Sequence, residues 1–396
     1  MLSILTYNEI DWTEWRRLVR ESRTGTWFQT PEAYTLFASM PELFRPFAIA
    51  IVNDANDANG ENDANGENDA NGGALRGVCV GYVTKEKSRI KQFFTRRAII
   101  VGGPAIADDC TDEEVETLMM TLRSMMTHNV LNDGMMAPIY IETRNFNDYS
   151  LWREAFERAG FEYKKHLNFH VNCTDKETMW ERLSENRKRQ VRKAQSTDHF
   201  IDRVQNTDII EWYGILERLY RTKVKTPLWP VEFFLEANRQ GVGKFLLVKY
   251  NNHVIGGSMI VCKGERLEVR GDRGMVNGDV SLNDANDANG AAKLPNDARG
   301  AVYEWFECGM NGEYKEQYPS VMATWAGMTY ANEHGYARYD MMGAGEPGVP
   351  YGVRDFKAEF GGDMVEHGRF VCVCHPMLYR IGTQVVKYLR MKGIKD

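Results

Sequence analysis

The sequence gives one order of secondary-structure elements twice, and this repetition restricts the folds that the chain can adopt. Each half opens with strand-forming stretches, PFAIAIV and LRGVCVGYV in the first half, KFLLVKY and AVYEWFECG in the second. An amphipathic helix, a strand, a short helix and a closing strand then follow in both halves. The repeated order predicts a duplicated α/β module, with two mixed sheets covered by helices.

The longer helix of the first half, predicted over residues 111–126, has clear local signals. Thr111 and Glu114 have the spacing of a capping box, in which each side chain accepts a backbone N–H of the other residue. Apolar residues recur at helical spacing after this box. They predict one buried helix face, made of Val115, Leu118, Met119, Leu122 and Met126.

A length of 396 residues fits about two domains. We predict a first domain over residues 1–165, completed by the C-terminal segment 363–396, and a second domain over residues 166–362. Asn-Asp-Ala-Asn-Gly units at 53–73 and 281–300 have no apolar face and interrupt the strand regions. They are predicted to be flexible surface loops, because these residues favour turns. A calcium-binding repeat is the alternative reading, but the spacing lacks the terminal Glu of such a loop.

Composition excludes several classes of protein. The formal net charge is -6 with 43% hydrophobic residues, so the chain is neither a polycation that coats nucleic acid nor a disordered acidic tail. Seven cysteines without a C-x-x-C pair argue against a disulfide framework and a metal site. We expect a cytoplasmic protein without a cofactor, a leader peptide or a membrane span. The basic tail KYLRMKGIK is compatible with peripheral contact with an anionic membrane.

One run of basic residues predicts a local anion site. In the stretch SENRKRQVRKA, five of the seven residues from 187 to 193 are basic. On a helix, most of these cations fall on one side and leave Val191 and Leu183 for the inner side. The candidate substrate-binding residues of this basic stripe are Arg187, Lys188, Arg189, Arg192 and Lys193. The stripe predicts a phosphate or polyanion site, and a solvated helix face is the alternative.

Four stretches resemble the Fem family of non-ribosomal peptidyltransferases, which add amino acids from aminoacyl-tRNA to peptidoglycan precursors. They are TWFQTPEAY, LSENRKRQVRKA, PSVMATWAGMTYANEHGYARYDMMG and YGVRDFKAEFGG, in this order along the chain. The resemblance covers nearly the whole chain apart from the two Asn-Asp repeats. It implies two tandem GNAT-like acyltransferase domains, in agreement with the internal repeat. It also implies an aminoacyl-tRNA donor and a nucleotide- or lipid-linked peptidoglycan precursor as acceptor.

The resemblance implies a role at the reacting centre for Phe356 and Lys357, which match a Phe-Lys pair of the family. Attack of an amine on an aminoacyl ester creates an oxyanion, and a fixed ammonium aimed at that oxygen lowers the barrier. Lys357 is therefore our candidate catalytic residue together with Phe356. Two alternatives remain open for this lysine: it holds a phosphate of the tRNA terminus, or its stem packs along Phe356 and Phe360.

The chain also departs from the family pattern. A lysine that grips the nucleotide diphosphate in some relatives has no match near Thr35. Lys223 and Lys225 are the candidate replacements from the second domain, and Tyr303 and Trp305 complete the predicted substrate-binding residues. The helical hairpin arm of some members is absent, so the chain resembles the armless forms.

Two other functions remain open at this point. A GNAT-type N-acyltransferase would use acyl-CoA, but RQGVG at 239–243 precedes a predicted strand where a pyrophosphate loop would lead into a helix. VGGPAI at 101–106 has the residues of a turn. A catalytically silent binding protein with the same fold would be indicated by loss of the Phe-Lys pair, which is present.

Overall fold

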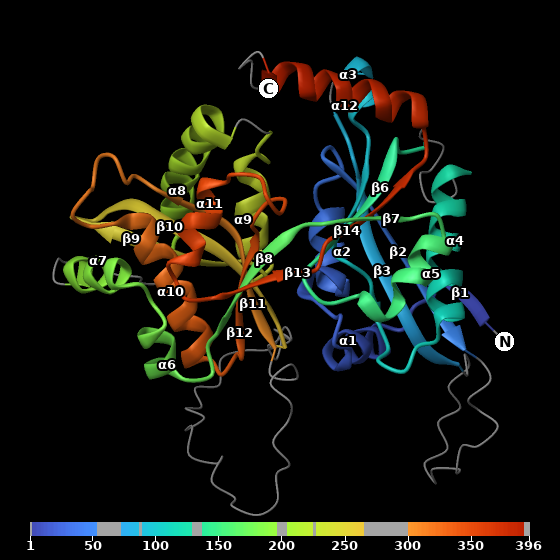
Figure 1. Ribbon diagram of the computed structural model, residues 1–396, viewed down its shortest axis with the longest axis horizontal. Coiled ribbons are helices and arrows are strands. Elements are labelled where there is room, and N and C mark those ends of the chain that lie inside the picture. Colours follow the sequence, from blue (N-terminus) through green and yellow to red (C-terminus); the bar gives the residue numbers. More distant parts are fainter. Residues whose placement is uncertain are drawn as a thin grey trace, which may run out of the picture.

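The computed structural model describes residues 2–53, 73–86, 89–128, 137–195, 204–224, 227–264 and 300–391. Most of both predicted loops, at 54–72 and 281–299, lies outside these residues. Within the described chain there are two mixed β-sheets with helices on their faces (Figure 1). The predicted α/β class with an internal repeat is confirmed, because both sheets have the same pattern of strand pairing.

The first sheet has the order β1-β2-β3-β4-β6-β14-β7, with β5 paired to β3. Its strands are β1 (Leu2–Thr6), β2 (Phe44–Asn53), β3 (Ala74–Thr84), β4 (Ala98–Gly102), β5 (Ala105–Ile106), β6 (Tyr140–Asn145), β7 (Glu162–Lys164) and β14 (Arg369–Val373). The second sheet has the order β13-β8-β12-β11-β10-β9. Its strands are β8 (Leu167–Asn172), β9 (Lys244–Tyr250), β10 (His253–Lys263), β11 (Ala301–Gly309), β12 (Arg338–Gly343) and β13 (Asp363–Glu366).

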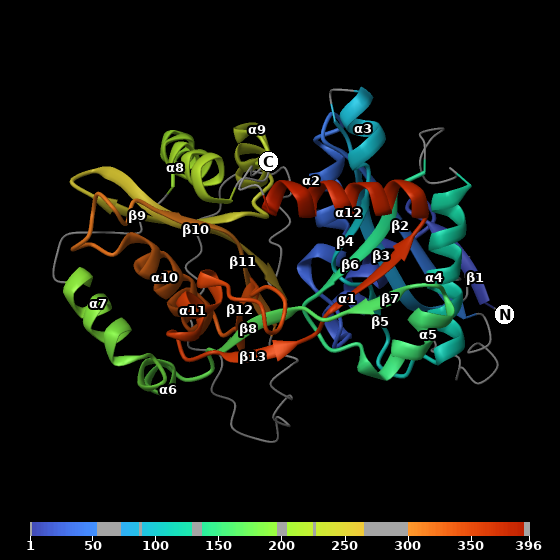
Figure 2. The same cartoon turned by 45° about the horizontal axis from the view of Figure 1, so that its top comes forward.

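Each sheet contains one strand from the other half of the sequence. Strand β8 directly follows β7 in the chain but pairs with β12 and β13 of the second sheet. Strand β14 directly follows β13 but pairs with β6 and β7 of the first sheet. Both crossings pass through the centre of the molecule, where Figure 2 shows them between the two halves. The two closing strands, HLNFHV and RFVCVCH, are therefore exchanged between the halves.

The strand pairing does not decide where one predicted domain ends and the other begins. Strand β8 adds to the second sheet and β14 to the first, while β13 pairs within the second sheet. The division at residues 165 and 363 stays a prediction.

Helices cover both faces of each sheet (Figures 1 and 2). Those of the first half are α1 (Trp12–Glu21), η1 (Trp27–Gln29), α2 (Pro31–Ala38), α3 (Arg89–Thr95), α4 (Asp112–Thr127), η3 (Ser150–Trp152) and α5 (Arg153–Arg158). Those of the second half are α6 (Lys176–Glu181), α7 (Glu185–Gln195), α8 (Asn206–Leu219), η4 (Tyr220–Val224), α9 (Val231–Arg239), α10 (Pro319–Glu333) and α11 (Gly352–Ala358). The last helix, α12 (Pro376–Met391), lies over the first half beside α3.

Helix α4 confirms the local predictions for this segment. Its capping box is formed, because Glu114 N donates to Thr111 Oγ1 and Thr111 N donates to Glu114 Oε2. The whole predicted apolar face is buried, namely Val115, Leu118, Met119, Leu122 and Met126. All seven cysteines are free thiols, as expected for a chain without a disulfide framework.

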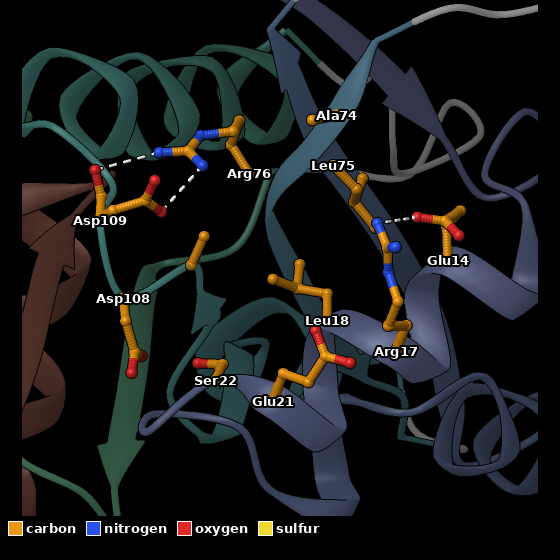
Figure 3. Close-up of a pocket in the computed structure, with 11 residues that line it drawn as sticks. Glu14, Arg17, Leu18, Glu21, Ser22, Ala74, Leu75, Arg76, Asp108 and Asp109 are labelled. Carbon is orange, nitrogen blue, oxygen red and sulfur yellow. Dashed lines mark hydrogen bonds and ion pairs between the residues drawn. The ribbon is translucent and has the colours of Figure 1, made fainter. Parts of the chain in front are cut away.

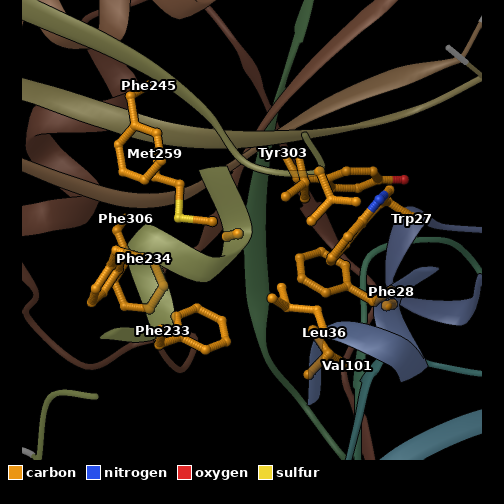
Figure 4. Packing of buried hydrophobic residues seen from close by; sticks show 14 of the residues in the cluster. Trp27, Phe28, Leu36, Val101, Phe233, Phe234, Phe245, Met259, Tyr303 and Phe306 are labelled. Atoms are coloured by element: carbon orange, nitrogen blue, oxygen red, sulfur yellow. The ribbon is translucent and has the colours of Figure 1, made fainter. Parts of the chain in front are cut away.

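One hydrophobic core joins the two halves. It contains Trp27, Phe28, Leu36 and Val101 of the first half, packed with aromatic residues of α9, β9 and β11 (Figure 4). Polar contacts reinforce the junction: Lys263 Nζ donates to the Ser22 carbonyl at 2.8 Å. Burying each such aromatic side chain contributes roughly 1.5 to 3 kcal/mol, so the two sheets are held in one arrangement.

The two Asn-Asp repeats connect strand ends that are already paired. Asn53 is opposite Ala74 at the end of β2 and β3, and Lys263 is opposite Ala301 at the end of β10 and β11. We predict that a short Gly-Ser turn can replace residues 54–72, and that the second repeat, at 281–299, is dispensable in the same way. Shortening a loop from roughly 20 residues to about 4 stabilises the fold by about 1.4 kcal/mol through loop-closure entropy. Thermal unfolding should show an unchanged or slightly raised Tm, and a fall of more than about 5 °C would mean that the segment packs.

Candidate active site

Strands β11 and β12 separate from one another, and the site lies where they part. They are parallel, and their pairing covers only Ala301–Tyr303 opposite Arg338–Asp340. The corresponding parallel strands of the first half, β4 and β6, pair over the whole of Ala98–Gly102. Separated parallel strands leave backbone groups that need partners from elsewhere. Among the described strands, this opening therefore distinguishes the second half from the first.

Lys357 donates hydrogen bonds to the backbone carbonyls of β12 where this strand has parted from β11. Its Nζ donates to the carbonyls of Met341 and Gly343, the latter at 2.9 Å. These bonds use two of the three N–H donors of the ammonium and leave one for another acceptor. The Lys357 side chain is buried, with its ammonium at these two carbonyls. Its catalytic role stays a prediction.

A β-bulge places two carboxylates on the same face of the second sheet. Met259 of β10 is opposite Phe306, while its neighbour Ile260 is opposite Glu304, so Trp305 is the extra residue of β11. Side chains of a strand normally alternate between faces, and an extra residue shifts this alternation by one. Glu304 and Glu307 consequently both face α10, although they are three residues apart.

Glu304 is fixed by hydrogen bonds from two sides. Its Oε1 accepts from Thr324 Oγ1 of α10 at 3.1 Å and from the Tyr339 hydroxyl of β12 at 2.8 Å. Burial raises the pKa of Glu304, and the charge of Lys357 and these hydrogen bonds act against that effect. Glu304 is thus a positioned buried acid beside the lysine.

Glu307 differs because one carboxylate oxygen is left unpaired. Its Oε1 is buried and has no hydrogen-bond partner among the described residues. Burial, assisted by the charge of Glu304, raises the pKa of Glu307 to about 8, although Ser320, Lys357 and Arg187 act to lower it. A carboxyl with this pKa exchanges its proton near neutral pH, which suits a general base or acid.

Lys357 is influenced by the same charges. Burial lowers the pKa of Lys357, while the carboxylates of Glu304, Asp340 and Glu307 act to raise it. Three acids and one base therefore influence one another at this site. Such a group of buried charges is expensive to maintain, and it is typical of functional sites.

Arg187 is the one member of the basic stripe that points inward. It is buried between α7 and α11, with its guanidinium 4.4 Å from the centre of the Phe356 ring and 4.9 Å from that of Phe360. It also donates to the Phe356 carbonyl at 3.4 Å and lies 3.6 Å from Glu359. Arg187 thereby holds the helix that carries Lys357, and Phe356 is part of this packing.

The other stripe residues lie toward solvent. Lys188 and Lys193 form ion pairs with Glu185 and Glu316, and Arg189 donates to Asn186. Arg192 lies over the ring of Trp180 at 5.2 Å. Val191 and Leu183 are buried, as predicted for the inner side of the helix.

The remaining candidate residues lie away from this site. Tyr303 is fully buried, and Trp305 packs edge-on against Phe28 with ring centres 4.9 Å apart. Both belong to the core between the two halves. Lys223 is exposed in η4, and Lys225 lies outside the described residues. Tyr303, Trp305 and Lys223 therefore do not join Lys357 in one site.

A pocket of about 340 Å³ lies on the first half between α1, β3 and the segment after β5 (Figure 3). Its charges already pair with one another. Arg76 donates to Asp109 at 2.9 Å and to Glu114 at 3.0 Å, and Arg17 pairs with Glu14. This pocket offers no unpaired acid or nucleophile comparable to Glu307.

The described residues contain no helix that is both long and apolar enough to cross a membrane. In the same residues, no three His, Cys, Asp or Glu side chains gather as they would around a metal ion.

The part of the chain that forms this site is also the part that matches a known protein family. Residues 298–387 match the FemAB family. The matched segment runs from β11 to α12 and includes Glu304, Glu307 and Lys357. The predicted resemblance to the Fem family is thus confirmed in the C-terminal part of the chain.

Solved structures extend the FemAB likeness to the whole fold. The crystal structure of FemX aligns with a TM-score of 0.62 at 11% identity, covering 96% of this chain and 99% of FemX. A tandem GNAT protein from the clavulanic acid biosynthesis pathway aligns with a TM-score of 0.50 at 7% identity, covering 94% of this chain and 99% of that one. The predicted tandem GNAT-like fold is confirmed. No match is found among curated protein sequences.

Sequence reasoning missed the two carboxylates of the FemAB-matched strand β11. Glu304 and Glu307 are the acids of AVYEWFECG, a stretch that is otherwise apolar and buried. Charged residues in such a strand are a signal in themselves, because they are rarely buried without a function. The orientation of both carboxylates toward the same face could not be predicted from the sequence, because it depends on the bulge at Trp305.

The raised pKa of Glu307 makes a prediction for stability. Because its pKa is higher in the folded protein than in the unfolded chain, its favourable contribution is full below about pH 4.5 and is lost as the pH rises through about 8. Glu307→Gln should remove this loss. We expect the variant to gain on the order of 2 to 4 kcal/mol over the wild type between pH 5 and pH 8.

Thermal or urea unfolding at pH 5, 6.5 and 8 measures this difference. Glu313→Gln is a matched control, since Glu313 is half exposed and pairs with Arg218. A difference between Glu307→Gln and the wild type that does not change with pH would contradict the raised pKa.

Proposed function

We propose that the protein is an aminoacyltransferase that moves an amino acid from aminoacyl-tRNA to an amine of a peptidoglycan precursor peptide. The observation that supports this most directly is the coincidence of two features. The segment that matches the FemAB family is also the segment whose strands separate around a buried lysine and two carboxylates. A donor and an acceptor of this kind imply a cytoplasmic reaction in cell-wall biogenesis.

Formation of a peptide bond from an aminoacyl ester has two chemical requirements. The attacking amine must be neutral, and the negative charge that develops on the carbonyl oxygen must be stabilised. Lys357 is suited to the second requirement, because its ammonium is fixed by two carbonyls and retains one N–H donor. A donor that is already oriented needs no reorganisation when the oxyanion forms.

Lys357→Met tests this assignment. The variant keeps the aliphatic stem, and we expect kcat and kcat/KM to fall together by about 10²- to 10³-fold, as for an interaction made only in the transition state. The assay uses radiolabelled aminoacyl-tRNA and a nucleotide-linked precursor peptide with a free amine. If Lys357 holds a phosphate, KM rises and kcat stays near its starting value.

A stability measurement separates catalysis from a purely structural role of Lys357. Methionine leaves the Met341 and Gly343 carbonyls without their donor, which costs about 1 to 3 kcal/mol for each buried group. Activity is therefore compared at a temperature where unfolding curves show both proteins to be folded. Retention of most of the wild-type kcat there would refute the catalytic role.

The basic stripe on α7 is proposed to bind the phosphate groups of the tRNA or of the nucleotide-linked precursor. Arg189 and Arg192 are exposed on the same helix, one turn apart. Substituting both by alanine should weaken binding and reduce the slope of log Kd against log salt by about 1 to 2, because fewer counterions are released. Fluorescence anisotropy with labelled tRNA at several salt concentrations measures the slope.

A matched control for the stripe is the pair Arg17→Ala and Arg20→Ala on α1. These arginines are also exposed and one helical turn apart, but they lie on the first half. Equal effects of the two double variants would mean that α7 is only a solvated face.

An N-acyltransferase that uses acyl-CoA is the second candidate, because the tandem GNAT protein shares the fold. The segment RQGVG does not lead into a helix, because it joins the end of α9 to β9. Acetyl-CoA in place of aminoacyl-tRNA in the same assay distinguishes the two donors.

A further inference from the structure

Next to Glu307 lies a second buried polar group without a partner. Ser258 of β10 is directly opposite Glu307 of β11, and residues opposite each other in an antiparallel pair project to the same face. Ser258 is fully buried, and its Oγ has no hydrogen-bond partner among the described residues. Unpaired buried polar atoms are uncommon in folded proteins, and two on adjacent strands indicate a ligand with hydrogen-bond donors.

The charges around this pair specify what kind of donor it would receive. Glu304 adds a second carboxylate on the same strand, and Lys357 and Arg187 are the cations that face Glu307 from α11 and α7. Arg187 lies 3.6 Å from Glu359 and packs against the aromatic rings of α11, with its Nε lacking a hydrogen-bond partner among the described residues, and Lys357 donates to the carbonyls of β12. Helix α10 contributes only the hydroxyls of Ser320 and Thr324. The carboxylate oxygen of Glu307 and the hydroxyl of Ser258 thus remain as two acceptors in a region with surplus negative charge.

We propose that Glu307 and Ser258 bind the primary ammonium of the acceptor substrate and that Glu307 removes its proton before the amine attacks. This inference rests on the proposed aminoacyl transfer and names the group that prepares the nucleophile. An ammonium has three N–H donors, which matches two protein acceptors and leaves one for the substrate or water. Glu307 is partly exposed as a residue, although its unpaired Oε1 is itself buried, whereas Glu304 is buried as a whole.

The proton balance of the reaction is as follows. The carboxylate of Glu307 takes one proton from the R–NH₃⁺ group and leaves a neutral amine with a free electron pair. That pair forms the C–N bond with the carbonyl carbon, and the C–O bond to the tRNA 3′ oxygen then breaks. The nitrogen loses a second proton, which ends on the 3′ oxygen, and Glu307 releases its proton to solvent. The products are an amide, a tRNA hydroxyl and one proton.

Glu307→Gln keeps the size of the side chain and removes the base. At pH 7 we expect kcat/KM for the amine acceptor to fall by about 10²- to 10³-fold. The wild-type rate should level off near pH 8. The variant depends on amine that is already neutral, so its rate should rise about tenfold per pH unit from pH 7 to pH 9, because a lysine-type ammonium has a pKa of about 10.4.

Two further variants complete this comparison. Ser258→Ala should raise KM for the acceptor by about 3- to 10-fold with a smaller change in kcat, because one acceptor of the ammonium is lost. Glu313→Gln removes a carboxylate outside the site and should leave both constants and the pH profile unchanged. If Glu307→Gln retains the rate and the pH profile of the wild type, the base is not Glu307, while aminoacyl transfer itself stands.

The proposed function fails if the wild type transfers no amino acid from tRNA. The ammonium site can then still be tested by a binding measurement. The probe is 1,5-diaminopentane, and 1,5-pentanediol is its uncharged control. The diamine should raise the Tm of the wild type at pH 8 and leave that of Glu307→Gln unchanged, and the diol should change neither. An equal effect of the diamine on both proteins, or none on the wild type, overturns the ammonium site.

Discussion

The end of backbone pairing between β11 and β12 is the constraint on which the site depends. Parallel strands normally satisfy each other's N–H and C=O groups along their length, and here that ends at Tyr303 and Asp340. The carbonyls that follow in β12 are buried, so they need a donor, and Lys357 is that donor. A buried ammonium in turn needs nearby negative charge, which Glu304, Asp340 and Glu307 provide. One interruption of a sheet thus brings an acid-base cluster into an otherwise apolar interior.

The duplicated halves differ at the corresponding place. In the first half β4 and β6 remain paired over five residues, and the buried Glu142 of β6 forms ion pairs with Arg144 and Arg369. In the second half the same strand pair opens, and α10 covers two carboxylates with Ser320 and Thr324. The two halves therefore share one architecture, whereas the separated strand pair and the proposed site lie in the second half. The first half contributes the aromatic core that fixes the position of β11.

Local features were predictable from the sequence, and features that depend on long-range pairing were not. The capping box of Thr111 and Glu114 and the buried face of α4 involve neighbours within a few residues, so periodicity sufficed. The inward position of Arg187 depends on α11, about 170 positions along the chain, and the burial of Tyr303 and Trp305 depends on how the halves pack. The pairing of Glu307 with Ser258 required both the register of β10 and the bulge at Trp305. The resemblance to the Fem family identified Lys357, yet only the structure showed which groups surround it.

The exchange of β8 and β14 affects how the chain can fold during its synthesis on the ribosome. When β6 and β7 have been synthesised, β14, which lies between them in the finished sheet, has not yet been made. The emerging first half therefore has an open sheet with unpaired backbone groups where β14 will insert. The nascent chain cannot complete its first sheet before its second half is made, so the two halves mature together and not one after the other. Premature termination would leave a strand edge that pairs with other chains, which makes this fold dependent on complete translation.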